Sequence, residues 1–249
     1  MGWFDRKKKA SAAEPQAAAA ERSNQALPEK AETFLTALDE ELQNVLPDQA
    51  SPDVDGLEDK LIQASFNAGE VLFESEEYEE AAEHLFDAAA AGHARAQYYL
   101  GEMNYNGWGM PENEIAAAEW YRLAARQGET DAMYKLGLLF HVGDDLPRDC
   151  EEAAGWYRMA AEKGHDEAWH ALGGMYRIGL IGETEDMQMA VSCWRKAGEL
   201  GNMTAQIDLA EYYRDAGDME EAVRWCRLAA AQGSDYAQRL LRDMGCADA

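Results

Sequence analysis

Small and apolar residues recur along most of the chain at fixed distances from five glycines. Each glycine is followed by an alanine after four residues and a leucine after eight, and is preceded by alanines eleven and four residues earlier. Steps of four and seven residues place side chains on one face of an α-helix. The pattern therefore predicts one helix after each glycine and a second before the next. The glycines are Gly92, Gly128, Gly164, Gly201 and Gly233.

The intervals between these glycines, 36, 36, 37 and 32 residues, define a repeated unit. An anchoring glycine fits the left-handed position that ends a helix. Gly107, Gly143 and Gly179 predict the turns between the two helices of the longer units. The sequence thus predicts an all-α solenoid of about five helix pairs with a polar capping helix at its end. The predicted units are 61–92, 93–128, 129–164, 165–201 and 202–233, with the cap in 234–249.

Two segments carry a family resemblance, LGEMNYNGWGMPENEIAAAEWYRLAARQG (100–128) and LGLLFHVGDDLPRDCEEAAGWYRMAAEKG (136–164). They resemble Sel-1-like repeats, the longer-looped relatives of tetratricopeptide repeats, and the resemblance covers about residues 61–249. Asn104 replaces an aromatic residue of the pattern, and Ala210 replaces the glycine that follows the leucine. The resemblance implies a right-handed α/α superhelix that serves as an adaptor or scaffold, often in bacterial signalling, host interaction or protein quality control.

The first 56 residues have a different composition. Residues 1–30 are rich in Ala, Glu, Gln and Ser, which predicts a disordered tail. Residues 31–56 predict an amphipathic helix at 32–46, followed by a linker, PDQASPDVDG, in which Pro47, Pro52 and Gly56 interrupt helix formation. This helix either caps the first repeat or binds something else. The predicted solenoid then extends over 57–249.

Charge excludes one class of partner. The 249 residues include 22 Lys and Arg against 48 Asp and Glu, a net charge of −26. Such a charge repels phosphate backbones, so no nucleic acid is expected. The sequence contains neither an 18-residue apolar run nor a signal-peptide core, which predicts a cytoplasmic protein without a transmembrane helix. The four cysteines are not paired as CxxC and are expected to be reduced thiols.

Catalytic motifs are absent from the sequence. It contains no GxxxxGK[ST] loop, GxGxxG turn, GxSxG elbow, HExxH helix or SxxK motif. His165 and His170 are five residues apart, about 140° around a helix, which disfavours shared metal ligation. We therefore expect no catalytic residue, cofactor or metal. A hydrolase with an unrecognised site is a remaining alternative.

The first helices of stacked pairs line the concave surface, and side chains opposite their packing stripe are available for recognition. Positions six and thirteen residues after the anchors carry aromatic residues in the early units and arginines in the late ones, although some of them could instead pack against a neighbouring repeat. Aromatic residues and arginines dominate interface energetics. The partner-binding prediction comprises Phe66, Phe73, Tyr98, Tyr105, Tyr134, His141, His170, Arg177, Arg214 and Arg239.

These patterns predict a non-catalytic adaptor that binds a peptide or protein segment in the groove. A segment with apolar residues followed by acidic ones, or with a free C-terminal carboxylate, would match the predicted row. The alternative is a peripheral membrane tether, in which Trp3 and Phe4 insert and Lys7, Lys8 and Lys9 meet anionic lipid. That contact would be weak and confined to the N-terminal MGWFDRKKK segment.

Overall fold

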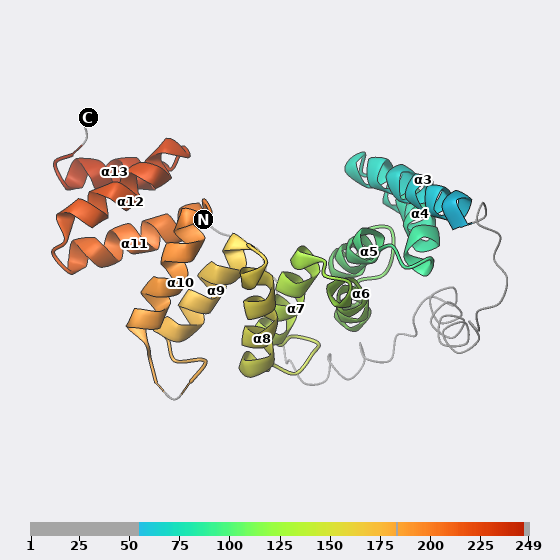
Figure 1. Cartoon of the computed structure of the whole chain (residues 1–249), viewed down its shortest axis with the longest axis horizontal. Helices are drawn as coiled ribbons and strands as arrows, with labels where there is room; N and C mark the ends of the chain where they lie inside the picture. Colours follow the sequence, from blue (N-terminus) through green and yellow to red (C-terminus); the bar gives the residue numbers. More distant parts are fainter. Residues whose placement is uncertain (1–54, 183, 247–249) are drawn as a thin grey trace, which may run out of the picture. The chain divides into compact units, whose positions relative to one another are not determined.

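The computed structural model describes residues 55–182 and 184–246, which form eleven α-helices and no strand (Figure 1). The all-α prediction is confirmed. The predicted tail at 1–30 and the predicted helix at 32–46 lie outside the described residues. The helices are α3 (Asp55–Glu74), α4 (Tyr78–Ala90), α5 (Ala94–Asn106), α6 (Glu114–Arg126), α7 (Thr130–Val142), α8 (Cys150–Glu162), α9 (Asp166–Arg177), α10 (Met187–Glu199), α11 (Met203–Asp215), α12 (Met219–Ala231) and α13 (Asp235–Asp243).

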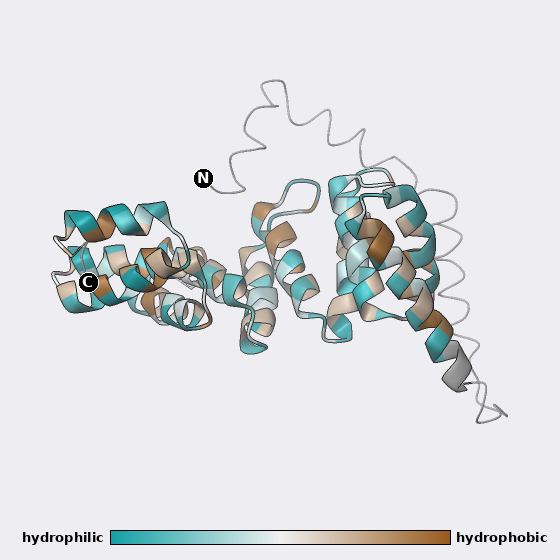
Figure 2. Ribbon diagram, turned by 90° about the horizontal axis from the view of Figure 1, so that it is seen from above, coloured by the Kyte–Doolittle hydropathy of each residue, from teal (hydrophilic) through white to brown (hydrophobic). Residues whose placement is uncertain are grey.

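The helices alternate between the two positions of the predicted unit. First helices are α3, α5, α7, α9 and α11, and second helices are α4, α6, α8, α10 and α12. From α5 to α11, each first helix packs against the second helix of its own unit and against that of the preceding unit, and α13 packs on α12. Each unit thus contacts its neighbours in sequence, as in a solenoid of helix pairs. In Figure 2, hydrophobic and hydrophilic residues alternate within single helices, as amphipathic packing requires.

The anchoring glycines end the second helices as expected. All five have positive φ, from 89° at Gly92 to 107° at Gly201. Gly107 and Gly143 are the left-handed C-caps of α5 and α7. Any other residue would be strained in this conformation, so glycine sets the helix ends.

Helix starts depend on side-chain caps. Eight helices begin after a residue whose side chain accepts a hydrogen bond from the backbone N–H three residues later. Such a cap contributes about 1 kcal/mol. The capping residues are His93, Asn113, Asp149, His165, Asp186, Asn202, Asp218 and Ser234.

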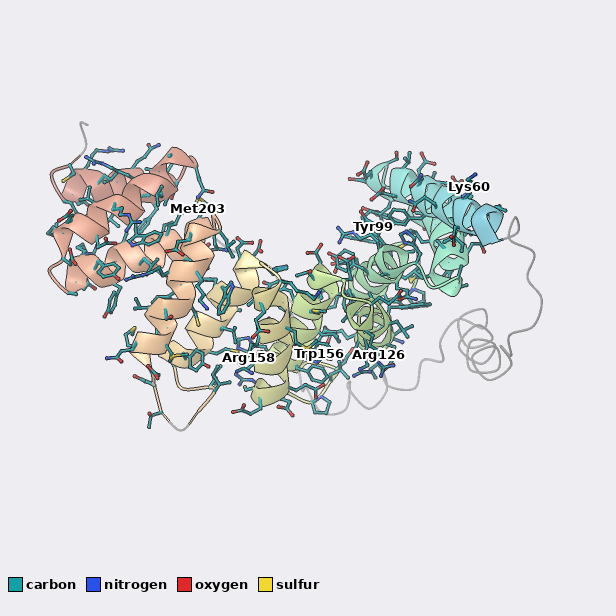
Figure 3. All side chains as sticks on the ribbon, in the orientation of Figure 1. Lys60, Tyr99, Arg126, Trp156, Arg158 and Met203 are labelled. Carbon is teal, nitrogen blue, oxygen red and sulfur yellow. The ribbon has the colours of Figure 1, made fainter. Side chains whose placement is uncertain are left out.

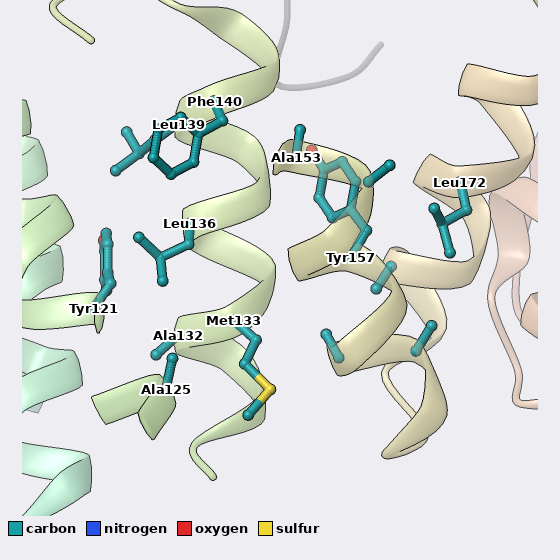
Figure 4. Packing of buried hydrophobic residues seen from close by; sticks show 14 of the residues in the cluster. Tyr121, Ala125, Ala132, Met133, Leu136, Leu139, Phe140, Ala153, Tyr157 and Leu172 are labelled. Atoms are coloured by element: carbon teal, nitrogen blue, oxygen red, sulfur yellow. The ribbon is translucent and has the colours of Figure 1, made fainter. Parts of the chain in front are cut away.

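The repeated alanine and leucine positions form the core. The three alanine rows are fully buried, and the leucines are at most 9% exposed. Figure 4 shows Leu136 pointing toward Tyr121 of the preceding unit, with Tyr157 on the other side of α7. Burying one leucine contributes about 1.5–3 kcal/mol. The rows are Ala81, Ala117, Ala153, Ala190 and Ala222; Ala88, Ala124, Ala160, Ala197 and Ala229; Ala96, Ala132, Ala168, Ala205 and Ala237; and Leu100, Leu136, Leu172, Leu209 and Leu241.

A close contact joins the two helices of most units. A glycine of the first helix, which follows the row leucine except in α3, where Gly69 follows Ala68, lies against a large side chain of the second helix. A Cβ on Gly137 would come within 2.5 Å of the Tyr157 ring. Ala210 replaces this glycine in the last unit, where the smaller Cys226 occupies the position of the large side chain. The pairs with glycine are Gly69 and Leu85, Gly101 and Tyr121, Gly137 and Tyr157, and Gly173 and Trp194.

The start of the first unit differs from the prediction. Helix α3 begins at Asp55, so Gly56 lies in its first turn and does not interrupt the helix. Glycine weakens a helix mainly in its interior, so a glycine in the first turn is compatible with the helix. Among the described helices, none has both the length and the apolar character needed to cross a membrane.

Candidate functional site

The predicted recognition residues of α3 are largely internal. Phe66 is only 7% exposed, and its ring stacks on His93 with centroids 4.2 Å apart. Phe73 lies among the rings of Tyr78, Tyr99 and Trp108. The prediction that Phe66 offers a surface to a partner is therefore wrong. The cause is that the rings of His93 and Tyr99, at the start of the following unit, cover the Phe66 ring.

The tyrosines of α5 and α7 are half-buried and oriented by neighbours. Arg95 lies over the Tyr98 ring, 4.6 Å from its centroid. Tyr134 stacks on the His165 ring at 4.5 Å. Burial raises the pKa of both phenols, to about 12 for Tyr134, so they are neutral hydrogen-bonding groups at physiological pH. Tyr105 is half-buried and packs against the central core.

His141 is directed toward the second helix of its unit. Its Nδ1 lies 3.4 Å from the Tyr157 hydroxyl. Burial, assisted by the positive charge of Arg148, lowers the pKa of His141. The imidazole is thus neutral at pH 7 and acts as a half-buried hydrogen-bonding group.

The C-terminal part of the row contains more negative charge than the sequence pattern indicated. His170 Nε2 lies 2.8 Å from Asp208 Oδ2, and Arg214 Nε donates to Asp215 Oδ1 at 2.9 Å. Arg177 is exposed and lies over the Trp194 ring at 5.9 Å. At this end of the predicted groove, carboxylates of α11 therefore pair with His170 and Arg214. The last predicted arginine, on α13, is also exposed and lies over a tyrosine ring: Arg239 is 5.9 Å from the Tyr236 centroid.

Polar pairs connect successive first helices. They join residues about one unit apart, so sequence spacing within a single unit did not reveal them. The sequence signal that could have revealed these pairs is the presence of complementary polar groups at similar offsets in neighbouring units. The pairs are Tyr99 with Glu70 (3.1 Å; Tyr99 is labelled in Figure 3), Arg95 with Glu129 and Asp131 (both 2.6 Å), Lys135 with Glu102 (2.6 Å), and Asn202 with Asp166 (3.1 Å).

Asp131 lies at the centre of these pairs. The hydrogen bond to His165 and the bond to Arg95 hold the pKa of Asp131 at about 2, against an opposing effect of burial. The carboxylate is therefore ionised at physiological pH and links α5, α7 and the start of α9. This network fixes the first helices relative to one another.

A shallow pocket of about 410 Å³, open to solvent, lies between α9, α10 and α11. Three carboxylates and one guanidinium line it, together with aromatic and apolar groups. Trp194 is 4% exposed, and its indole N–H has no acceptor among the described residues. The lining residues are Arg177, Met187, Trp194, Asp208, Glu211, Tyr212, Asp215 and Ala216.

Among the residues that the structure describes, one group has the composition of a metal site. Ligand atoms of His165, Asp166 and Glu167 lie within 4.8 Å of one another. However, His165 Nδ1 accepts the N–H of Ala168 as the cap of α9, and Nε2 lies 3.5 Å from Asp131. Both ring nitrogens already have protein partners. The arrangement is that of a helix cap within the polar network.

The cysteines are free thiols. Cys193 and Cys226 are buried, and burial raises the pKa of the Cys193 thiol to about 11. A thiol with a raised pKa is a poor nucleophile at pH 7. These two residues act as small apolar side chains of the core.

Comparisons with known proteins agree with the repeat geometry. The family model described as Sel1 repeat matches residues 94–129, 130–165, 167–202 and 204–234. The crystal structure of a Sel1 repeat protein from Oxalobacter formigenes is 30% identical, with a TM-score of 0.63, over 72% of this chain and 74% of that chain. No curated protein matches the sequence.

A second solved structure is longer than this chain. It is c5321, a protective antigen present in uropathogenic Escherichia coli strains and displaying an SLR fold. The similarity has 26% identity and a TM-score of 0.68, over 75% of this chain and 43% of that chain. The chain thus spans less than half the length of that protein.

Proposed function

Because the chain belongs to the Sel1 repeat family, whose members are generally protein-interaction scaffolds, we propose that it is a non-catalytic adaptor that binds a segment of another protein along its first helices. The observation that carries this proposal is the row of half-buried, oriented side chains on α5, α7 and α9. Tyr98, Tyr134 and His170 each have a fixed neighbour and an exposed part. Side chains that are already ordered lose little entropy on binding.

The polar pairs between first helices support the same proposal. Arg95 and Lys135 each connect α5 and α7, which holds Tyr98 and Tyr134 at a set separation. A peptide that contacts both rings then meets a pre-organised surface. Tyrosine is among the residues that contribute most to protein interfaces, since it combines apolar area with a hydroxyl group.

The charge of the partner segment follows from the carboxylates on the same helices. The sequence pattern favoured an acidic segment or a C-terminal carboxylate at Arg177 and Arg214. Arg214 is paired with Asp215, and Asp208 and Glu211 line the pocket beside Arg177. With a net charge of −26 on the chain, a basic segment is attracted and an acidic one repelled. We therefore replace the acidic partner by a basic one.

The test is quantitative capture of partners from the source cell by the intact protein. Tyr98→Ala with Tyr134→Ala removes contact area and should reduce capture at least about tenfold. Met159→Ala with Leu228→Ala is the control, because these exposed apolar side chains lie on second helices. Undiminished capture by the tyrosine variant, with both variants folded, would place recognition elsewhere, for example in residues 1–56.

A further inference from the structure

The solvent-facing side of the first helices is apolar in α7 and α9. Side chains three, seven, ten and fourteen residues after an anchor lie within about 60° of one another around the helix, away from the leucine row. Val142 and Ile178, at the last of these positions, are 47% and 53% exposed. We propose that this surface binds apolar side chains at the centre of the partner segment, whose basic residues lie on both sides. The inference rests on the proposed function and adds the chemistry of its partner.

Two polar pairs give the register between successive first helices. In each pair, the residue seven positions after one anchor meets the residue ten positions after the preceding anchor, with Gly69 of α3 aligned on Gly101 of α5. The pairs are Tyr99 with Glu70 (3.1 Å) and Lys135 with Glu102 (2.6 Å). The same register places Ala171 of α9 beside Leu138 of α7. An apolar pair therefore stands where the two preceding interfaces have polar pairs.

The apolar surface comprises Leu138, Val142, Ala171, Gly174 and Ile178, and it is open to solvent. Leu138 and Ala171 are half-buried. Val142 follows Leu138 by four residues on α7, and Ile178, the C-cap of α9, follows Gly174 by four. A Cβ on Gly174 would meet nothing within 4 Å, so the space above it is free. Apolar groups of a partner that cover these side chains remove them from water, which favours binding.

Carboxylates occupy the equivalent positions on either side. Ten residues after the anchor, α3, α5 and α11 have glutamate, whereas α7 and α9 have leucine and glycine. Fourteen residues after it, α3 and α11 are acidic. The flanking acids are Glu70, Glu74 and Glu102 on one side and Asp208, Glu211 and Asp215 on the other. The two cations at the four positions of the described first helices, Arg95 and Lys135, are already in ion pairs. The flanks therefore attract a segment with lysine or arginine on both sides of an apolar centre.

The proposed recognition row borders this surface. Tyr134 and His170 precede Leu138 and Gly174 by four residues, so each pair lies side by side on its helix. A segment that covers the apolar surface therefore also meets the oriented side chains on which the proposed function rests.

The experiment begins with selection by the intact protein from a displayed peptide library, which is the probe. Its random sequences have about 12 residues, enough to cross four helices spaced by roughly 10 Å. We expect enriched peptides to have leucine, isoleucine, valine or phenylalanine at the centre and lysine or arginine on both sides. The most enriched peptide, labelled with fluorescein, then gives a dissociation constant by fluorescence anisotropy. Enrichment of acidic peptides, or of none, would overturn the proposal.

Gly174→Glu separates apolar contact from charge. It places a glutamate where α5 and α11 have one, and the free space accepts the side chain. Replacing glycine within a helix favours the helix, so the variant should fold. We expect at least about fivefold weaker peptide binding, because a polar group then covers the apolar surface. Gly174→Ala is the control and should keep the affinity within about twofold. Tighter binding by Gly174→Glu would mean that charge alone acts, and the proposal would be refuted.

A second pair of variants removes the exposed apolar groups. Val142→Gln with Ile178→Gln should weaken the peptide at least about tenfold. Met159→Gln with Leu228→Gln makes the same kind of change at similarly exposed positions of α8 and α12 and should leave the affinity unchanged. Circular dichroism confirms that both variants are folded. Equal loss in the two variants would mean that the peptide binds apolar surface without selection, which contradicts the proposal.

Two other occupants are distinguished by further measurements. A dimer in sedimentation equilibrium that dissociates in the Val142 and Ile178 variant would make the occupant a second copy of the chain. Peptide binding that becomes at least about tenfold tighter when the four basic residues 6–9 are changed to glutamine would make the occupant a segment of this chain. Either result would overturn the proposal.

The two proposals fail in different ways. If Tyr98→Ala with Tyr134→Ala loses partner capture while the Val142 and Ile178 variant keeps it, the adaptor function stands and the apolar docking surface fails. If peptide binding depends on Val142 and Ile178 while the tyrosine variant keeps partner capture, the docking surface stands and the tyrosine contacts of the proposed function fail.

Discussion

The helix pairs α7–α8 and α11–α12 have the same buried leucine and alanine rows but differ at one internal contact. In the first pair the Tyr157 ring lies against Gly137, whereas the second pair has Cys226 and Ala210 at these positions. A large residue is matched by glycine and a small one by alanine. The comparison teaches that the repeat core consists of constant rows and one pair whose two members must change together.

The largest expected effect concerns the rows that both units share. Leu136→Ala and Leu209→Ala should each lower the free energy of unfolding by about 2–5 kcal/mol, since both leucines are fully buried and their truncation leaves a cavity. Urea unfolding followed by circular dichroism measures the loss. A cost several-fold smaller in one unit would show that the rows are not equivalent.

The next effect concerns the pair that differs. Gly137→Ala should lower stability by about 1–3 kcal/mol, because the new Cβ would overlap the Tyr157 ring. Helix propensity alone would favour alanine by about 1 kcal/mol. The reverse change, Ala210→Gly, should cost only about 0.5–1 kcal/mol through backbone entropy.

A double-mutant cycle separates overlap from other effects. In a Tyr157→Cys background, which reproduces the composition of the last unit, Gly137→Ala should become neutral or stabilising. The same urea measurement gives the coupling energy. If Gly137→Ala costs as much with cysteine as with tyrosine, ring and glycine are not a matched pair.

A smaller effect on stability concerns the polar surface of the α7–α8 pair, which carries Asp131 and differs here from the α11–α12 pair. Asp131 on α7 has a pKa of about 2, below the usual value of 3.8, so its contribution to stability is present above pH 4 and is lost as pH falls through 2. Asp131→Asn should lower stability at pH 7 by about 1 kcal/mol, less than the full shift implies because the side chain is 39% exposed. The variant should also lose less stability than the parent between pH 4 and pH 2. Parallel acid unfolding curves would contradict this assignment.

The smallest effect compares the two short turns. Glu76, between α3 and α4, has φ of 63°, and Gly217, between α11 and α12, has φ of 82° at the equivalent position. Glu76→Gly should stabilise the protein by about 0.5–1 kcal/mol, because glycine adopts a positive φ without the steric strain that a residue with a side chain has there. Thermal unfolding should show a small increase in midpoint. A decrease would mean that the greater conformational freedom of glycine in the unfolded chain costs more stability than the relief of backbone strain provides.

Much of the fold was predictable because the repeated spacing indicates which residues pack in the core. The interval from Gly128 to Leu136 recurs in unit after unit, and helical geometry converts it directly into a buried stripe. Contacts between units were harder to predict. Phe66 occupies a recognition position by its offset, but it is buried because the rings of His93 and Tyr99 in the next unit lie against it. Asp208 pairs with His170 from the neighbouring unit, a contact that spacing within a single helix does not show.

The ring and glycine pairs have a consequence for how such chains lengthen. Gly101 and Tyr121 both belong to 93–128, and Gly137 and Tyr157 both belong to 129–164. A duplicated stretch of gene that encodes one whole unit therefore carries both members of its most demanding contact. The alanine and leucine rows must then fit the new neighbours, and these rows recur at the same offsets from residue 93 onward. An array of this kind can gain or lose whole units by recombination while each unit keeps its own internal fit.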